Sequence, residues 1–237
     1  MAEQTIPVWD LEDIGDWWKR ANTNVIAPII AIPTTAGTGS EVGRAAVLTN
    51  TTTLEKKILF HPQMLPVVVI GDPELAVGLP ADLTAATGMD AFTHSFETFC
   101  TASFHPMADG IALESMRLIK AYLPIVTENG SDLDARLKMF TASMMAGVAF
   151  QKGLGAAHSI AHPLGAMFGL HHGLANAILL PYVIAFNRPK IEDKLSRVAQ
   201  TLQVGENYDD VIGWLLAFRK TLNIPNTLAE VGLSIDH

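Results

Sequence analysis

The apolar residues of the first third of the chain occur in short runs rich in β-branched side chains. Ala27–Ile32 (APIIAI) and Val67–Ile70 each predict a strand that is buried on both faces. Ala45–Thr49 and Lys57–Phe60 flank the polar segment NTTTLE and predict a hairpin. Between these elements, Pro33–Glu41 (PTTAGTGSE) is a loop rich in glycine and threonine. This part of the chain is therefore expected to be an α/β structure.

Beyond about residue 78 the apolar positions recur every three or four residues, which predicts helices. Pro80, followed by Asp82, begins the first helix, and a second covers Gly88 to Cys100. Ser131 is the expected N-cap of a helix over Leu133–Phe150. Further helices are predicted over residues 107–123, 156–168, 173–187, 190–203 and 208–222. The sequence thus predicts two domains, an α/β portion over residues 1–77 and an all-helical portion over residues 78–237.

Composition narrows the possible classes of function. Of the 237 residues, 49% are hydrophobic and 17% are charged, as expected for a large buried core and not for a disordered chain. The net charge is -8 and no basic cluster is present, so nucleic acid is not an expected partner. Pro, Gly, His or Asn interrupts the long apolar stretches, so no membrane association is expected. The single cysteine, Cys100, allows no internal disulfide and favours a cytoplasmic location.

Two clusters of residues indicate a metal site. Asp90 and His94 are four residues apart, so they share one face of a helix. His158 and His162 form a second such pair, and His171 and His172 follow shortly after. A carboxylate with several imidazoles suits Fe²⁺ or Zn²⁺ better than Mg²⁺ or Ca²⁺, which prefer more oxygen ligands.

The alternative interpretation is that these histidines are ordinary core residues with hydrogen-bond partners. Four of the eight histidines lie within residues 158–172, where charged side chains are almost lacking. Burying so many imidazoles without partners costs free energy, which favours a metal site. Spacing alone favours His158 and His162 as a chelating pair, but it does not decide which histidine is left over.

Three motifs resemble the iron-containing (group III) alcohol dehydrogenases: PTTAGTGSEV (33–42), GMDAFTHSFE (88–97) and HSIAHPLGAMFGLHHGLANAILLP (158–181). By that resemblance the metal ligands are Asp90, His94, His158 and His172. The histidine that matches His162 lies beside the substrate in the family and helps to relay a proton. His171 matches no family role and is expected to be structural.

The resemblance also implies a fold of the dehydroquinate synthase-like, iron-dependent alcohol dehydrogenase type. In it, an α/β dinucleotide domain and a helical domain enclose the metal and the substrate in a cleft. Thr34, Thr35 and Thr38 are then expected to approach the phosphates and ribose of a nicotinamide cofactor. Val47 and Lys56 are expected along the path of the cofactor, with Lys57 as the alternative to Lys56.

The chain departs from the family pattern at both of its ends. The GGGS segment that grips the cofactor pyrophosphate in the family would precede Trp9, and it is absent; the C-terminal end, from Ile224 to His237, also looks short. We therefore expect weak or no NAD(P) binding by the chain as it stands.

The sequence thus predicts a metal-dependent oxidoreductase that interconverts an alcohol and an aldehyde or ketone with Fe²⁺ (or Zn²⁺) and NAD(P). We expect a small-molecule substrate and a homo-oligomer. Two alternatives stay open: a metal-binding chain without turnover, and a metal-assisted lyase of the same fold, such as a dehydroquinate synthase.

Overall fold

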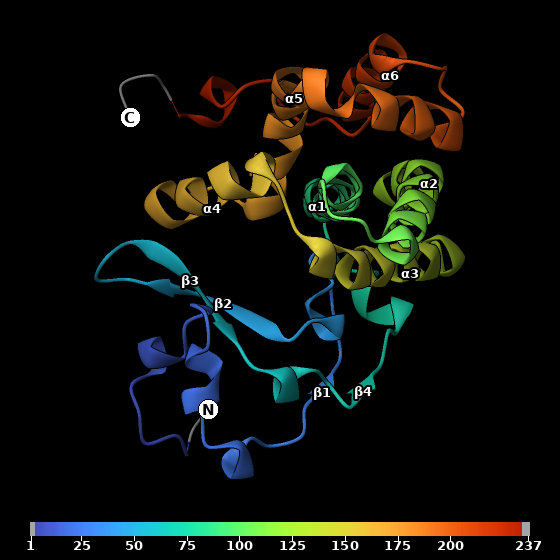
Figure 1. Ribbon diagram of the computed structural model, residues 1–237. Helices are drawn as coiled ribbons and strands as arrows, with labels where there is room; N and C mark the ends of the chain where they lie inside the picture. The colour runs from blue at the N-terminus through green and yellow to red at the C-terminus, as the bar shows by residue number, and fades with distance from the viewer. Residues whose placement is uncertain (1–2, 234–237) are drawn as a thin grey trace.

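The computed structural model describes residues 3–233 of the chain, so the outermost residues of both predicted domains, and of the C-terminal segment, lie outside it. Helices occupy one side of the molecule, and the short strands and the N-terminal segment occupy the other (Figure 1). The helices are α1 (Ala81–Cys100), α2 (Pro106–Glu128), α3 (Leu133–Ala149), α4 (Ala156–Phe168), α5 (His172–Leu202) and α6 (Tyr208–Thr221). None of these is long and apolar enough to cross a membrane.

The strands form two separate two-stranded sheets. β2 (Ala45–Asn50) and β3 (Glu55–Phe60) make the predicted antiparallel hairpin, which is confirmed. β1 (Ile30–Ala31) pairs in parallel with β4 (Val68–Val69). Short 3-10 helices connect these strands and the later helices: Val8–Leu11, Trp17–Arg20, Thr23–Val25, Ser40–Val42, Pro62–Met64, Pro73–Ala76, Phe150–Lys152 and Ala229–Val231.

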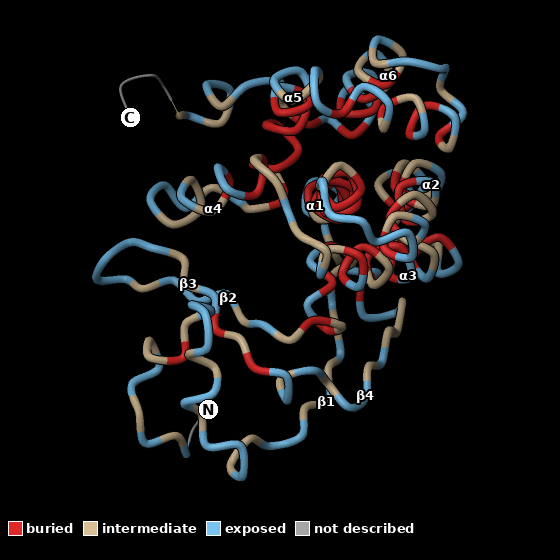
Figure 2. The backbone as a smooth tube through the Cα atoms, in the orientation of Figure 1, coloured by how far each residue is buried: buried red, intermediate tan, exposed pale blue. Residues whose placement is uncertain are grey.

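The prediction that Ala27–Ile32 and Val67–Ile70 are strands buried on both faces is wrong. Each is reduced to a two-residue strand, and Ile30 and Val67 are 62% and 68% exposed. An apolar run shows only that a segment is suited to burial, and burial also needs neighbouring elements on both faces of the sheet. In the described part of the chain no such layer covers β1 and β4 (Figure 2).

α1 is the centre of the helical side and is buried along most of its length (Figure 2). It packs against α2, α3 and α5, and a helix that is apolar or small on all sides is expected to be surrounded in this way. The predicted break at Gly88 is wrong, because α1 runs through it as one helix. A Cβ at Gly88 would overlap the side chain of Leu123, so glycine is needed here for the close approach of α2.

α5 is also one helix where two were predicted, over residues 173–187 and 190–203. It runs through Pro181, which the first predicted helix already contained, and through Pro189 at the predicted break. Proline lacks the N–H that would bond the carbonyl of Ala177 four residues earlier. The buried guanidinium of Arg219 on α6 replaces it, because Nη1 lies 3.0 Å from the Ile178 oxygen and 3.4 Å from the Ala177 oxygen. A contact from another helix thus compensates for the proline.

The remaining helix predictions differ in detail. α4 spans the predicted residues 156–168, and α6 ends one residue before the predicted 222. The N-cap of α3 is Asp132 instead of Ser131, with its Oδ1 accepting from the N–H of Ala135 at 2.9 Å. Both candidates are good capping residues, and only the path of the backbone decides between them.

The contact between α4 and α5 positions the histidine-rich segment. Small side chains at Ala157, Ala161 and Ala175 form a separate apolar cluster with Leu179 and Val183. Because these side chains are short, the backbones of α4 and α5 approach closely beside α1. The histidines at the start of both helices are therefore brought to the Asp90 face of α1.

Candidate metal centre

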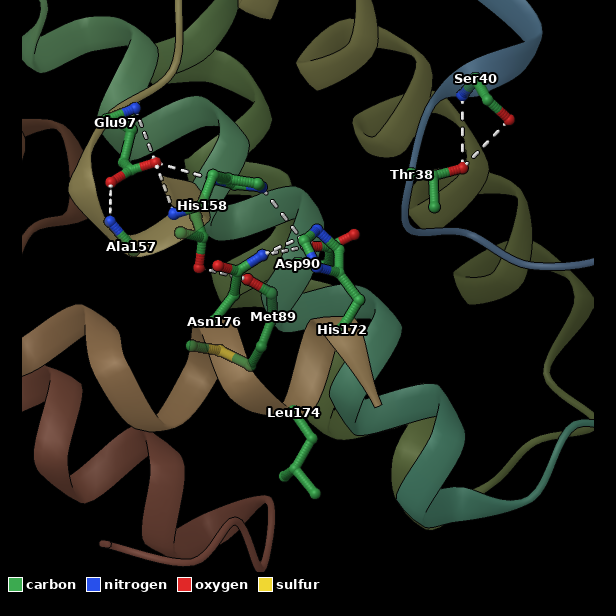
Figure 3. Close-up of polar contacts among 12 residues, drawn as sticks. Thr38, Ser40, Met89, Asp90, Glu97, Ala157, His158, His172, Leu174 and Asn176 are labelled. Carbon is green, nitrogen blue, oxygen red and sulfur yellow. Dashed lines mark hydrogen bonds and ion pairs between the residues drawn. The ribbon is translucent and has the colours of Figure 1, made fainter. Parts of the chain in front are cut away.

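Three helices bring the four predicted ligands together, and three of the four, Asp90, His158 and His172, are labelled in Figure 3. Asp90 and His94 are one turn apart on α1, His158 is in the first turn of α4, and His172 begins α5. Asp90, His94 and His158 are almost fully buried, whereas the His172 side chain is 24% exposed. The site therefore lies at the edge of the helical core, with His172 toward the open side.

The distances are those of an open coordination site. Asp90, His94 and His158 each offer one ligand atom such that the three atoms lie within 4.8 Å of one another, and residues 3–233 contain no other such group. Nε2 of His158 is 3.6 Å from Asp90 Oδ1, and Nε2 of His172 is 3.7 Å from the same oxygen. His172 lies at the margin of the three-residue group instead of within it.

Two of the imidazoles are held neutral by their surroundings. Burial lowers the pKa of His94 to about 4, against the attraction of Asp90, and the repulsion of His158 works in the same direction as burial. Burial likewise lowers the pKa of His172 to about 4. The His94 and His158 rings are stacked, with centroids 4.4 Å apart. Neutral imidazole is the form that binds a metal ion.

His158 is the exception among the ligand histidines. Its Nδ1 lies 2.7 Å from Oε2 of Glu97, a buried carboxylate on α1. Burial alone would lower its pKa, but Asp90 and Glu97 outweigh burial and raise the pKa of His158 to about 9. Without a metal ion this imidazole therefore carries the positive charge of the cluster.

Asp90 remains ionised. Burial would raise its pKa, but the neighbouring His94, His158 and His172 outweigh burial and leave the pKa well below its usual range. The side-chain amide of Asn176 on α5 donates a hydrogen bond of 2.7 Å to Oδ1 and lies 3.2 Å from Nε2 of His172. Asn176 thus ties the carboxylate to the fourth predicted ligand.

These residues fit a divalent metal ion. Within the described chain, the buried Nε2 of His158 and Nδ1 of His94 and His172 have no hydrogen-bond partner. Unsatisfied nitrogens in a buried site cost free energy, and a cation bound by neutral imidazoles would remove part of that cost. One carboxylate and three imidazoles is a donor set that suits Fe²⁺ or Zn²⁺.

His162 lies outside this group but beside it. Its ring centroid is 5.0 Å from that of His172 and 6.4 Å from that of His158. Burial lowers its pKa, and the charges of His158 and Lys56 add to that effect. It lines an open pocket of about 520 Å³ between α4 and the β2–β3 hairpin, together with Lys56 and Met167.

The two candidate lysines point in different directions. Lys57 forms an ion pair with Glu12, with Nζ 2.8 Å from Oε2. The Nζ of Lys56 lies against Gly165 of α4 instead, and its charge bears on both His162 and His172. The geometry therefore favours Lys56 over Lys57 as the lysine near the site.

The other predicted cofactor residues lie apart from the cluster. Thr34 and Thr38 are exposed, and Thr35 is half-buried. Thr38 Oγ1 accepts from the backbone N–H of Ser40 at 3.3 Å, and both side chains lie apart from His158 and His172 (Figure 3). The backbone of the neighbouring Gly37 interacts with His94. Val47 is 51% exposed on β2. These side chains are accessible to a ligand, and their part in cofactor binding stays a prediction.

Sequence reasoning missed Glu97 and Asn176, and it expected a structural role for His171. Glu97 follows Asp90 by seven residues and His94 by three, so its place on the same face of α1 was visible in the sequence. Asn176 follows His172 by four residues on α5. His171 is the N-cap of α5, with its Nδ1 accepting from the N–H of Leu174 at 3.3 Å.

Comparison with known families shows which family the chain belongs to. The sequence model of iron-containing alcohol dehydrogenase matches residues 1–73, and that of the C-terminal part of the Fe-containing alcohol dehydrogenase family matches residues 84–237. The chain belongs to the iron-containing alcohol dehydrogenase family. The resemblance inferred from the three motifs is thereby confirmed, and the second match contains all four predicted ligands.

The curated relatives of this chain are longer proteins. It is 42% identical to a 4-hydroxybutyrate dehydrogenase of Cupriavidus necator over 90% of this chain and 58% of the relative. It is 45% identical to a 1,3-propanediol dehydrogenase of Citrobacter freundii over 92% of this chain and 60% of the relative. An NAD-dependent methanol dehydrogenase of Bacillus methanolicus is 40% identical over 88% and 57%. The chain spans less than two thirds of the length of each of these relatives.

Solved structures confirm the predicted fold class. A 1,3-propanediol oxidoreductase superposes with a TM-score of 0.85 at 40% identity, over 90% of this chain and 58% of the other. An alcohol dehydrogenase from Oenococcus oeni superposes with a TM-score of 0.89 at 32% identity, over 98% and 62%. A sulfoacetaldehyde reductase from Bifidobacterium kashiwanohense, solved in complex with NAD+, gives 0.80 at 32% identity, over 88% and 56%.

Proposed function

We propose that this protein is a metal-dependent oxidoreductase that interconverts a small alcohol and the corresponding aldehyde or ketone with a nicotinamide cofactor. One observation carries the proposal: a buried carboxylate and three imidazoles converge beside a pocket that is lined by His162 and Lys56. The named activities of the relatives, alcohol and diol dehydrogenases that include an NAD-dependent one, agree with this chemistry.

Asp90, His94, His158 and His172 would hold the metal ion. A divalent ion there supplies a Lewis acid for the oxygen of an alcohol or carbonyl group, and the nicotinamide cofactor supplies the redox chemistry. His162 is a neutral base at neutral pH, since its pKa is lowered, and its ring borders the pocket. In alcohol oxidation it takes a proton and passes it to solvent. The ammonium of Lys56 gives the same pocket an anion-attracting group for the cofactor.

The test is a spectrophotometric assay. Metal-loaded protein with NADH and a short aldehyde is expected to lose absorbance at about 340 nm, and a chelator is expected to stop the loss. His162→Asn is expected to keep its metal and to slow turnover by roughly 10²–10⁴, the usual contribution of a general acid–base group. Turnover that continues at the same rate after complete removal of metal would contradict the proposal.

A second candidate is a metal-binding chain without turnover. It is favoured by one observation: the predicted cofactor side chains of Thr34, Thr38 and Val47 are exposed instead of enclosed by the described chain. If the metal-loaded chain binds NADH with a dissociation constant in the low micromolar range, this candidate is excluded.

We further propose that the protein is a homo-oligomer, because apolar side chains of β1 and β4 are exposed. We propose a cytoplasmic location because the chain has a single cysteine. Light scattering tests the assembly.

A further inference from the structure

Glu97 links the metal-site face of α1 to the beginning of α4. The side chain is buried, and its two oxygens accept hydrogen bonds from the start of α4 and from the His158 ring (Figure 3). Oε2 accepts from the N–H of Gly155 at 2.9 Å and from Nδ1 of His158 at 2.7 Å. Oε1 accepts from the N–H of Ala157 at 2.7 Å, and the N–H of His158 lies 3.5 Å from Oε2.

The carboxylate replaces a cap that α4 lacks. Gly155, the N-cap residue, has no side chain to accept from the first N–H groups of the helix. A negative charge at this position also complements the positive end of the helix dipole. The hydrogen-bond partners of both Glu97 oxygens are N–H donors. A glutamine at this position would therefore place its NH₂ group against an N–H group, whichever way the amide is turned.

The same carboxylate determines which nitrogen of His158 is free. When Nδ1 carries the hydrogen that Glu97 accepts, the lone pair is on Nε2. Nε2 is the atom that lies 3.6 Å from Asp90 Oδ1, and it has no hydrogen-bond partner in the described structure. The contact of Glu97 with the backbone of α4 therefore also fixes the direction of the ligand atom.

We propose that Glu97 is the positioning residue of the metal centre: it caps α4 and holds His158 in the Nδ1–H form, with Nε2 directed at the metal position. Glu97 is not itself a ligand, because its oxygens are occupied by α4 and His158. The inference rests on the proposed metal centre. Partners of this kind orient ligand imidazoles, and their loss typically weakens metal binding 10–100-fold.

The experiment compares Zn²⁺ affinity in three chains by competition with a chromophoric chelator. Glu97→Gln keeps the size of the side chain and removes the charge. Asp132→Ala is the matched control, because it removes the cap of α3 without touching a histidine. We expect Glu97→Gln to bind Zn²⁺ about 10–100 times more weakly than the parent chain and Asp132→Ala to bind it as the parent does. Both variants are expected to melt at a lower temperature than the parent.

Equal Zn²⁺ affinity of Glu97→Gln and the parent chain would reduce Glu97 to a helix cap and overturn the inference. A parent chain that binds no metal would instead contradict the proposed metal centre itself. If Glu97→Gln does not fold, proton–nitrogen correlation spectra of the histidine rings in the zinc-loaded parent decide. A His158 ring with its hydrogen on Nδ1 supports the inference, and a hydrogen on Nε2 overturns it.

Discussion

The charge state of a single imidazole controls how this site meets a metal ion. At neutral pH His94 and His172 are uncharged, whereas the pKa of His158 is raised to about 9 and that ring holds an extra proton. A bound cation and that proton compete for the same lone pair, so metal binding must release the proton.

The first prediction follows from this competition. The folded pKa of His158 is raised, so the proton is held below about pH 9 and lost above it. Between about pH 6.5 and pH 9 the binding of one metal ion should release about one proton, and the apparent affinity should rise about tenfold per pH unit. Calorimetric titrations in two buffers of different ionisation enthalpy measure the proton count. No proton release, with an affinity that is constant across that range, would contradict the prediction.

Two adjacent histidines allow a second prediction with a built-in control. His172 is the fourth predicted ligand, and His171 caps the same helix. His172→Ala should lose most of the bound metal, while His171→Ala should keep it and lose only stability, by about 1 kcal/mol for the missing cap. Elemental analysis of both purified variants distinguishes them. If His171→Ala empties the site and His172→Ala does not, the ligand assignment is wrong.

At the scale of residues, the sequence alone predicted the candidate ligands but not the hydrogen-bond partners that hold those ligands in place. The four-residue spacing indicated Asp90 with His94 and favoured His158 with His162, and only the resemblance of the motifs to the family indicated His172. The fold brings Asp90, His94 and His158 together, with His172 at the margin of the group. The partners Glu97 and Asn176 were not predicted, because their hydrogen bonds join residues 61 and 86 positions apart. A helical repeat shows which side chains share a face but not which other helix that face meets.

At the scale of elements, α5 shows how a long helix tolerates an internal proline. Arg219 is 1% exposed and supplies hydrogen bonds to the carbonyls of Ala177 and Ile178, beside Pro181. The apolar pattern predicted a helix over residues 173–187 that already contained Pro181, although a proline usually interrupts a helix, and the predicted break lay between residues 187 and 190. The compensation comes from α6, and a local pattern contains no information about a donor about forty residues away.

The third prediction tests this compensation. Arg219→Met removes the guanidinium donor and keeps most of the side-chain volume. The carbonyl oxygens of Ala177 and Ile178 then stay buried without that donor. We expect a loss of about 1.5–3 kcal/mol in the free energy of unfolding, the usual contribution of hydrogen bonds to a charged group. Arg188→Met, which removes an exposed ion pair with Glu192 on α5, should cost less than about 1 kcal/mol. Denaturant unfolding measures both, and equal losses would show that Arg219 does not support the helix.

At the scale of the whole molecule, the metal site joins α1, α4 and α5, which are separate in sequence. A ligand that binds only the folded state stabilises that state by mass action. The fourth prediction is therefore a rise in melting temperature with Zn²⁺ or Fe²⁺. At about 100 times the dissociation constant the gain is about 2.7 kcal/mol, which corresponds to roughly 5–10 °C for a chain of this size.

The control for this prediction is Asp90→Asn, which keeps the shape of the side chain and removes the ligand charge. Its melting temperature should not respond to added metal. If the parent melts at the same temperature with metal and with chelator, the buried histidines are ordinary core residues, and the metal-centre account fails.

The central claim is that one divalent cation binds where α1, α4 and α5 converge. Anomalous diffraction from crystals grown with Zn²⁺ or Fe²⁺, collected at the absorption edge of that metal, tests it most directly. We predict one anomalous peak per chain, coordinated by Asp90, His94, His158 and His172 at about 2.0–2.2 Å. No peak at this position, or a peak bound by His162 in place of His172, would contradict the account.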